Sequence, residues 1–295
     1  MTEKDWKSTL AWRELLDGLR EMDQQFLTGP KAVTGEQAVA EGYRFLAAIL
    51  GVASDIYLHS DPVRPRFADI NTPFRMDRRW GGDNTDAYYA FVPVDPTRTY
   101  RVWGNRADSA YFSLTVYNEP TPGQWSDQII GIVNDTDLGC APGEDFEFYL
   151  GPTRPDGYDG PFVELPTDAA AALTRDYQHD PKTGRRIEWQ IEPVNSASPV
   201  PLTDAAMARS LRAVLRWSQE MFGIVPLTIA PREDRTTVGH NAPIGANVMA
   251  PPYQVGAISY GWSAKDACYS FGSFVLDPGE ALVITHRPPA SRFWN

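Results

Sequence analysis

Residues 144–152, EDFEFYLGP, decide the fold class because their polarity alternates with a period of two. The apolar side chains Phe146, Phe148 and Leu150 alternate with Asp145, Glu147 and Tyr149. Successive side chains of a β-strand point to opposite faces of a sheet, so this pattern is typical of a strand with one buried face. The segment therefore predicts a half-buried strand.

The same period of two recurs on both sides of this segment. It is found in residues 87–94, 98–105, 109–118, 160–166 and 185–193. Turn-forming Gly, Pro, Asn and Asp residues separate these stretches. Short strands divided in this way predict antiparallel sheets arranged as a sandwich or jelly roll.

The C-terminal part of the sequence predicts a hairpin. Residues 269–276, YSFGSFVL, and residues 281–288, ALVITHRP, flank the tetrapeptide Asp277-Pro278-Gly279-Glu280. Proline followed by glycine fits a type II turn, in which glycine supplies the positive φ.

Three other stretches repeat their apolar residues at steps of three and four, which is typical of helices that bury one side. They are residues 5–27, 34–58 and 203–222. Thr34 and Gln37 have the spacing of a capping box, which predicts the start of the second helix. The alanine-rich residues 166–178, PTDAAAALTRDYQ, are interpreted as a helical insertion.

These patterns together predict an α+β protein in which N-terminal helices pack on an antiparallel, jelly-roll-like β-sandwich. The predicted organisation is a helical segment at residues 1–60 and a sandwich domain with helical insertions at residues 61–295. A chain of 295 residues suits one large domain or two tightly packed ones.

The charge of the chain argues against two classes of partner. The formal net charge is −11 and the isoelectric point is about 4.9, whereas nucleic acids and anionic membranes attract basic surfaces. The sequence has no secretory signal and no apolar run long enough to span a membrane. We therefore expect a cytoplasmic protein that binds neither nucleic acid nor membrane.

The stretch GGDNTDAYY, residues 81–89, admits three interpretations. Asp83, Asn84 and Asp86 supply oxygen atoms that a Ca²⁺ ion could use. The same residue types next to glycine favour a plain turn. As a third alternative, the stretch forms the polar lip of a pocket, where Asp83 and Asp86 are candidate catalytic residues and Asn84 binds the substrate.

The loop that precedes this stretch has the densest cluster of polar residues in the chain. His59 lies two residues from Asp61 and is a candidate acid or base, while Arg64 and Arg66 are candidate substrate ligands. The alternative is structural, with His59 at the end of the second helix and the arginines in salt bridges.

Further candidates lie elsewhere in the chain. His240 is the second candidate catalytic residue, in the irregular stretch 232–254 that also contains the candidate ligand Tyr253. Arg101 and Asn105 flank a strand end and are candidate substrate ligands, because arginine can bind a carboxylate or sulfate with two hydrogen bonds. They could equally form a structural network with acidic surface residues. Serine nucleophile elbows, phosphate-binding loops, zinc-protease motifs and Cys-x-x-Cys pairs are absent from the sequence. A pair of catalytic carboxylates remains open.

Four segments resemble the bacterial family known as domain of unknown function 1214, which is often found with its 1254 partner. They are GDNTDAYY at 82–89, TYRVWGNRADSAYFSLTVYN at 99–118, DFEFYLGP at 145–152 and YSFGSFVLDPGEALVITHRPPASRFWN at 269–295. The resemblance covers most of the chain from about residue 40. VWGN and the terminal RFWN region are its most specific parts. It implies a jelly-roll-like sandwich with helical additions and implies no established reaction.

Proteins similar to this chain continue beyond the RFWN segment with another strand. This difference from the similar proteins implies either that the chain is a fragment or that a second polypeptide completes the sheet after Asn295. A homo-oligomer is the other assembly that we consider.

Two function hypotheses from different classes remain. The first is a small-molecule enzyme, a hydrolase or lyase, that acts on a polar or carbohydrate-like substrate without a metal or other cofactor, Ca²⁺ being the only metal considered. The second is a non-catalytic ligand-binding, carbohydrate-binding or assembly module, because jelly rolls serve in all these roles.

Overall fold

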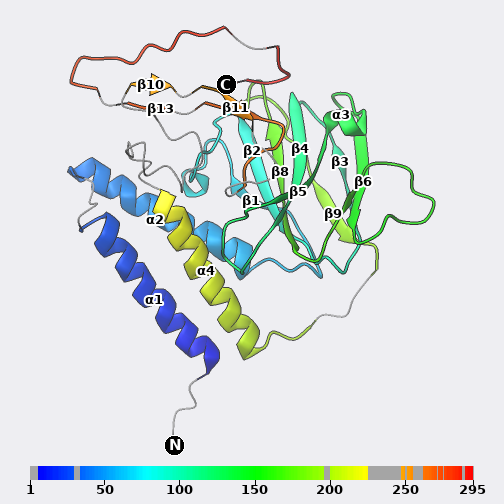
Figure 1. Cartoon of the computed structure of the whole chain (residues 1–295), viewed down its shortest axis with the longest axis horizontal. Helices are drawn as coiled ribbons and strands as arrows, with labels where there is room; N and C mark the ends of the chain where they lie inside the picture. The colour runs from blue at the N-terminus through cyan, green and yellow to red at the C-terminus, as the bar shows by residue number, and fades with distance from the viewer. Residues whose placement is uncertain are drawn as a thin grey trace, which may run out of the picture.

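Two large β-sheets, two small two-stranded sheets and a layer of helices form the described part of the chain (Figure 1). The computed structural model describes residues 6–29, 34–195, 200–224, 247–249, 251–254, 262–270, 272–274, 276–287 and 290–294. The α+β class is therefore confirmed.

The three long predicted helices are present. They are α1 (Lys7–Phe26), α2 (Glu36–Tyr57) and α4 (Asp204–Ile224). The predicted capping box at Thr34 and Gln37 is wrong, because no side chain caps α2. Gly35 occupies the N-cap position with a φ of 96°, a conformation that glycine adopts at little cost.

The strands form a five-stranded sheet in the order β1-β2-β8-β4-β5 and a four-stranded sheet in the order β7-β6-β3-β9. The first sheet contains β1 (Ala68–Asn71), β2 (Ala87–Pro93), β4 (Tyr111–Asn118), β5 (Ile129–Asn134) and β8 (Ala169–Tyr177). The second contains β3 (Tyr100–Asn105), β6 (Asp145–Gly151), β7 (Phe162–Glu164) and β9 (Gln190–Pro193). All pairs are antiparallel except β6 with β7. Two short helices, η1 (Met76–Arg78) and α3 (Asp135–Leu138), interrupt the connections.

The alanine-rich residues 166–178 form strand β8, so the predicted helical insertion is wrong. This strand pairs with β2 on one side and with β4 on the other. Alanine favours helices, but that preference amounts to less than 1 kcal/mol per residue and tertiary context overrides it. The hydrogen bonds to two partner strands and the burial of both faces decide the structure of this segment.

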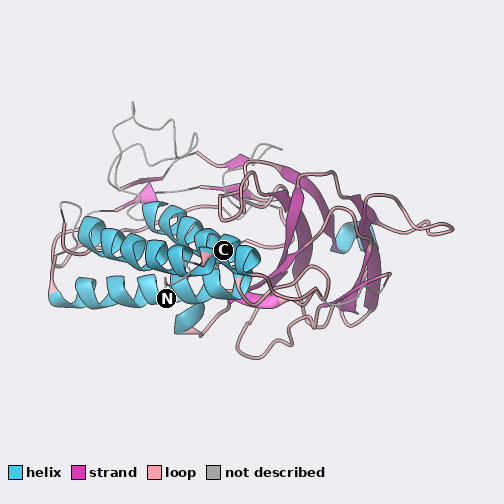
Figure 2. Cartoon of the chain, turned by 90° about the horizontal axis from the view of Figure 1, so that it is seen from below, coloured by secondary structure: helices cyan, strands magenta, loops and turns pink. Residues whose placement is uncertain are grey.

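Two cores hold the three layers together. One lies between the sheets and includes Val102, Leu114 and Phe148. The other lies between the outer face of the five-stranded sheet and the helices, and includes Ile49 of α2 and Trp217 of α4. Figure 2 shows these helices grouped on one flank of the sheets. The prediction that N-terminal helices pack on the sheets is confirmed for α2, whereas α1 packs mainly on α4.

In the residues that the structure describes, the predicted C-terminal hairpin is represented by its turn alone. Gly279 has a φ of 92° and the Glu280 N–H donates to the Asp277 carbonyl over 3.0 Å, which confirms the turn. Four two-residue strands pair differently from the prediction: β10 (Val248–Met249) with β13 (Gly272–Ser273), and β11 (Tyr253–Gln254) with β12 (Cys268–Tyr269). Residues 276–287 contain no strand.

None of the helices in the described ranges is long and apolar enough to cross a membrane.

Candidate functional site

The stretch GGDNTDAYY forms a turn that leads into β2. The Asn84 Oδ1 atom accepts the Asp86 N–H at 2.8 Å, and Gly81 has a φ of 62°. The turn interpretation is therefore confirmed. The Asp83 carboxylate pairs with the Arg79 guanidinium. Burial raises the pKa of Asp83, although Arg79 acts to lower it.

The predicted residues of the preceding loop lie apart. His59 is exposed, and its carbonyl accepts a hydrogen bond from Arg66 at 3.3 Å. Arg64 is also exposed and contacts Asp61 at 3.4 Å. Arg66 borders a shallow hollow of about 250 Å³ that His59 does not line. The structure does not bring His59 together with Asp83 and Asp86 at this hollow.

The charges that line this hollow are already paired, which argues against a binding site for a charged ligand. Arg78 and Arg75 line it, and each already pairs with an aspartate. The Arg78–Asp55 distance is 2.5 Å and the Arg75–Asp77 distance is 2.6 Å.

The remaining predicted residues lie outside this loop. Arg101 pairs with Glu147 at 2.6 Å and with Glu192 at 3.3 Å. Asn105 donates to the Gly143 carbonyl and the Asp145 carboxylate at 2.8 and 2.7 Å, and accepts the Ala107 N–H at 2.9 Å. These contacts hold strands and turns. Tyr253 is placed only as part of strand β11, and His240 lies outside the described residues.

A more enclosed cavity, of about 100 Å³, lies between α2 and the outer face of the five-stranded sheet. Tyr57 from the end of α2, Phe91 from β2 and Trp262 form its aromatic walls. Glu119, the first residue after β4, contributes a carboxyl group. The cavity therefore combines apolar walls with one acidic side chain, which is typical of small-molecule sites.

The loop after β4 fixes the Glu119 carboxyl. Its Oε1 atom accepts hydrogen bonds from the Tyr57 hydroxyl at 2.6 Å and from the Gly123 N–H at 2.8 Å. Within the described residues, Oε2 has no hydrogen-bond donor. One oxygen atom of the carboxyl is thus held in place by two donors from different parts of the chain.

Helix α4 holds the loop that follows Glu119. The Glu220 carboxylate accepts the Trp125 N–H at 2.7 Å, and Arg216 donates to the Pro122 carbonyl. These contacts dock residues 119–128 on α4. They also bring a second carboxyl group, Glu220, into the electrostatic environment of Glu119.

The surroundings of Glu119 favour its protonated form. Burial raises its pKa, and the nearby Glu220 carboxylate acts in the same direction. The hydrogen bonds from Tyr57 and Gly123 and the charge of Arg216 lower the pKa, but less strongly. Burial and the two glutamates also raise the pKa of the Tyr57 hydroxyl. An acid with a raised pKa is suited to proton transfer near neutral pH.

The raised pKa of Glu119 predicts a pH-dependent penalty on stability. The folded state holds this proton more tightly than the unfolded chain, whose pKa is near 4.5. Stability is therefore lost as the pH rises from below 4.5 through the folded-state pKa. Relative to wild type, Glu119→Gln should gain about 1.4 kcal/mol per unit of pKa shift between pH 4 and pH 7.

Urea unfolding at both pH values measures this gain. The exposed Glu164 supplies the control substitution Glu164→Gln. A stability difference between Glu119→Gln and wild type that is the same at both pH values would contradict the pKa shift.

Gly123 is required where the loop meets α4. Its φ is 89°, and a Cβ atom there would lie 2.4 Å from the Ala213 carbonyl oxygen. We expect Gly123→Ala to reduce the free energy of unfolding by about 1–3 kcal/mol and to shift the N–H that binds Glu119. Gly143→Ala is the matched control, because Gly143 has a φ of 82° and open space around it. If urea unfolding shows the same loss of free energy of unfolding for Gly123→Ala and Gly143→Ala, the close contact with α4 is unimportant.

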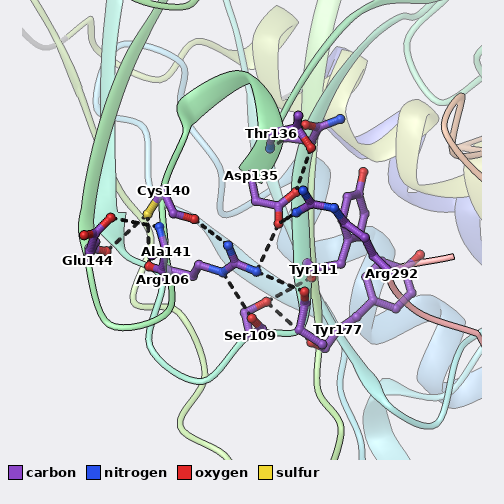
Figure 3. Close-up of polar contacts among 12 residues, drawn as sticks. Arg106, Ser109, Tyr111, Asp135, Thr136, Cys140, Ala141, Glu144, Tyr177 and Arg292 are labelled. Carbon is purple, nitrogen blue, oxygen red and sulfur yellow. Dashed lines mark hydrogen bonds and ion pairs between the residues drawn. The ribbon is translucent and has the colours of Figure 1, made fainter.

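A second polar cluster joins the two most distinctive sequence motifs (Figure 3). The Asp135 carboxylate is fully buried and pairs with Arg106, next to VWGN, at 3.0 Å. It also pairs with Arg292 of RFWN. Arg106 further donates to the Ser109 and Ala110 carbonyls at 3.2 and 3.0 Å. The cluster fastens the C-terminal segment to the sheets, and we assign it a structural role.

Metal binding finds no support in the described ranges, where no group of three or more His, Cys, Asp or Glu side chains could hold an ion.

Comparisons with known proteins place the fold and leave the function open. No family model and no curated protein matches the chain. An uncharacterised protein from Burkholderia cenocepacia has a similar crystal structure, with a TM-score of 0.63 and 25% identity over 72% of this chain. The match covers 57% of that protein, so this chain spans little more than half of its length. The VPA0106 protein from Vibrio parahaemolyticus matches with a TM-score of 0.32, 11% identity and coverage of 55% of this chain and 41% of that one.

Proposed function

We propose that the protein is a small-molecule enzyme that uses Glu119 as a general acid in a hydrolase or lyase reaction. The observation that carries this proposal is the Glu119 carboxyl at the cavity. One of its oxygen atoms is held by Tyr57 and Gly123, and its pKa is raised by burial. In this role the protonated carboxyl gives its proton to the leaving group of the substrate.

The cavity limits the part of the substrate that enters it. Its volume of about 100 Å³ is smaller than the roughly 150 Å³ of a cavity that accommodates benzene. A group of a few non-hydrogen atoms therefore fits beside Glu119, and the aromatic Trp262 and Phe91 contact its apolar face. A small polar substrate agrees with these dimensions, whereas a sugar unit is larger than benzene and would place only part of its ring in the cavity.

The second carboxyl group supports the same reaction class. Glu220 raises the pKa of Glu119, and pairs of carboxyl groups with different environments commonly divide acid and base roles. The Glu220 carboxylate already accepts the Trp125 N–H at 2.7 Å. Burial is the main cause of the raised Glu119 pKa, and the Glu220 carboxylate makes a smaller contribution in the same direction.

The proposal also includes three features of the protein's fold, family and location. They are the jelly-roll connection of the strands, membership of the family with domain of unknown function 1214, and a cytoplasmic location. The confirmed α+β fold supports the first of these. The meeting of the VWGN and RFWN regions at Asp135 supports the second.

A turnover screen tests the proposed function. Wild type, Glu119→Gln and Glu164→Gln are incubated with chromogenic esters, amides and glycosides with small acyl or sugar groups. We expect turnover of at least one compound by wild type and Glu164→Gln, and its loss in Glu119→Gln. If ligands raise the melting temperature but none is turned over, the alternative of a non-catalytic binding module is favoured.

A further inference from the structure

A buried arginine lies at the centre of the outer face of the five-stranded sheet. Arg175 of β8 is 2% exposed. Tyr89 of β2 and Ser113 of β4 stand directly opposite it in the two neighbouring strands. Side chains at directly opposed positions lie on the same face of the sheet, with Cβ atoms about 4.5–5.5 Å apart.

Within the described residues, Arg175 has only neutral partners. It donates to the Thr115 hydroxyl at 3.2 Å, the Tyr117 hydroxyl at 3.0 Å and the Trp262 carbonyl at 2.5 Å. Burial disfavours the charged guanidinium, but the surrounding tyrosines Tyr117, Tyr177, Tyr269 and Tyr89 raise its pKa. The positive charge is therefore retained. A buried charge without a counter-charge is costly, and proteins normally pair it.

Two hydroxyl groups on this face are left without a partner in the described structure. The Ser113 hydroxyl is completely buried and has no hydrogen bond. The Tyr111 hydroxyl, one row further along β4, is also buried without a partner. Buried polar groups in native proteins are nearly always satisfied, so each such group requires an explanation. One bound anion would account both for the Arg175 charge, which has no counter-charge, and for the Ser113 hydroxyl, which has no acceptor.

We propose that Arg175 and Ser113 form a binding site for a monoanionic carboxylate. A carboxylate carries one negative charge, which balances the single charge of Arg175, and it accepts hydrogen bonds from both residues. A phosphate dianion would leave one excess negative charge in a buried site. The tyrosine rings around Arg175 provide an apolar surface for the organic part of the ligand.

This site is distinct from the Glu119 cavity, although the two share one element. Trp262 lines the Glu119 cavity with its side chain and accepts the Arg175 hydrogen bond with its carbonyl. Tyr117, which accepts a hydrogen bond from Arg175, donates to the adjacent Ser263 carbonyl at 2.5 Å. The inference does not depend on the proposed reaction of Glu119.

Thermal unfolding of the full chain in different salts tests the site. Melting temperatures are compared in sodium chloride, sodium acetate and sodium phosphate at equal ionic strength and at pH 8.5, where inorganic phosphate is mainly the dianion. We expect acetate to raise the melting temperature of wild type with saturation, and phosphate to have no more effect than chloride. An equal rise in phosphate would overturn the assignment to a carboxylate.

Substitution of Ser113 provides the sharper test. Ser113→Asp places a carboxylate opposite Arg175, so we expect it to raise the melting temperature in chloride and to remove the response to acetate. Ser113→Ala should raise the acetate concentration for half of the effect about tenfold or more, because a hydrogen bond to a charged ligand is lost. Ser113→Ala also keeps the test decisive if Ser113→Asp fails to fold.

Ser218 of α4 offers a matched control. Its hydroxyl is equally buried and has no hydrogen-bond partner within the described structure. Ser218→Asp should therefore lower the melting temperature. If Ser113→Asp lowers it by the same amount, or if both Ser113 variants respond to acetate as wild type does, the site is refuted.

Discussion

Replacing Asp135 with asparagine is expected to lower the free energy of unfolding by about 3–5 kcal/mol. Asp135 is fully buried and is the ion-pair partner of Arg106, whose side chain is 8% exposed. The neutral amide would leave the Arg106 charge buried without a counter-charge. The same change would release Arg292, so the C-terminal segment would lose its ion pair with the sheets.

Urea unfolding gives the loss as a shift of the midpoint with an unchanged slope. Asp108→Asn is the matched control, because its ion pair with Arg185 is exposed to solvent and such pairs contribute little. Arg292→Gln should cost less than Asp135→Asn, since Arg292 is half-exposed. Equal midpoints for Asp135→Asn and Asp108→Asn would contradict the structural role of the cluster.

Replacing Glu119 with glutamine is expected to lower turnover by about 10²–10⁴-fold, the usual contribution of a general acid. Glutamine is close in size to glutamic acid and can still accept the Tyr57 and Gly123 hydrogen bonds, but it cannot give up a proton. The loss should therefore appear in kcat more than in KM. The measurement is steady-state kinetics on the panel compound that wild type turns over fastest.

A second variant separates chemistry from positioning. Tyr57→Phe removes the hydroxyl that holds Glu119 at 2.6 Å and retains the acid. We expect a smaller loss of turnover than in Glu119→Gln, together with a change in the apparent pKa of the reaction. A greater loss in Tyr57→Phe than in Glu119→Gln would contradict the assignment of the acid to Glu119.

Much of the fold follows from periodicity in the sequence. The alternation at residues 144–152 and the helical period at residues 34–58 predict β6 and α2. Strand β8 could not be predicted in this way, because four alanines resemble a helix and only the neighbouring strands make them a central strand. Non-local pairing of this kind leaves no signal within the segment itself.

The candidate site was much harder to predict than the fold. His59, Asp83 and Arg66 stand out in the sequence because polar residues crowd one loop, but the structure ties many of these residues into turns and ion pairs. Glu119 and Tyr57 lie 62 positions apart and belong to no motif. The one local signal is a glutamate between the end of an apolar strand and Pro120. Arg175 was hidden in the segment interpreted as a helix.

The most direct test of the central claim, that Glu119 acts as a general acid, is the pH dependence of kcat/KM for wild type and Glu119→Gln. Burial raises the Glu119 pKa above 4.5, and only the protonated carboxyl can act as the acid. We predict that the wild-type rate falls as the pH rises through an apparent pKa above 4.5, and that the residual activity of Glu119→Gln lacks this decrease. Identical pH profiles for the two proteins would contradict the account.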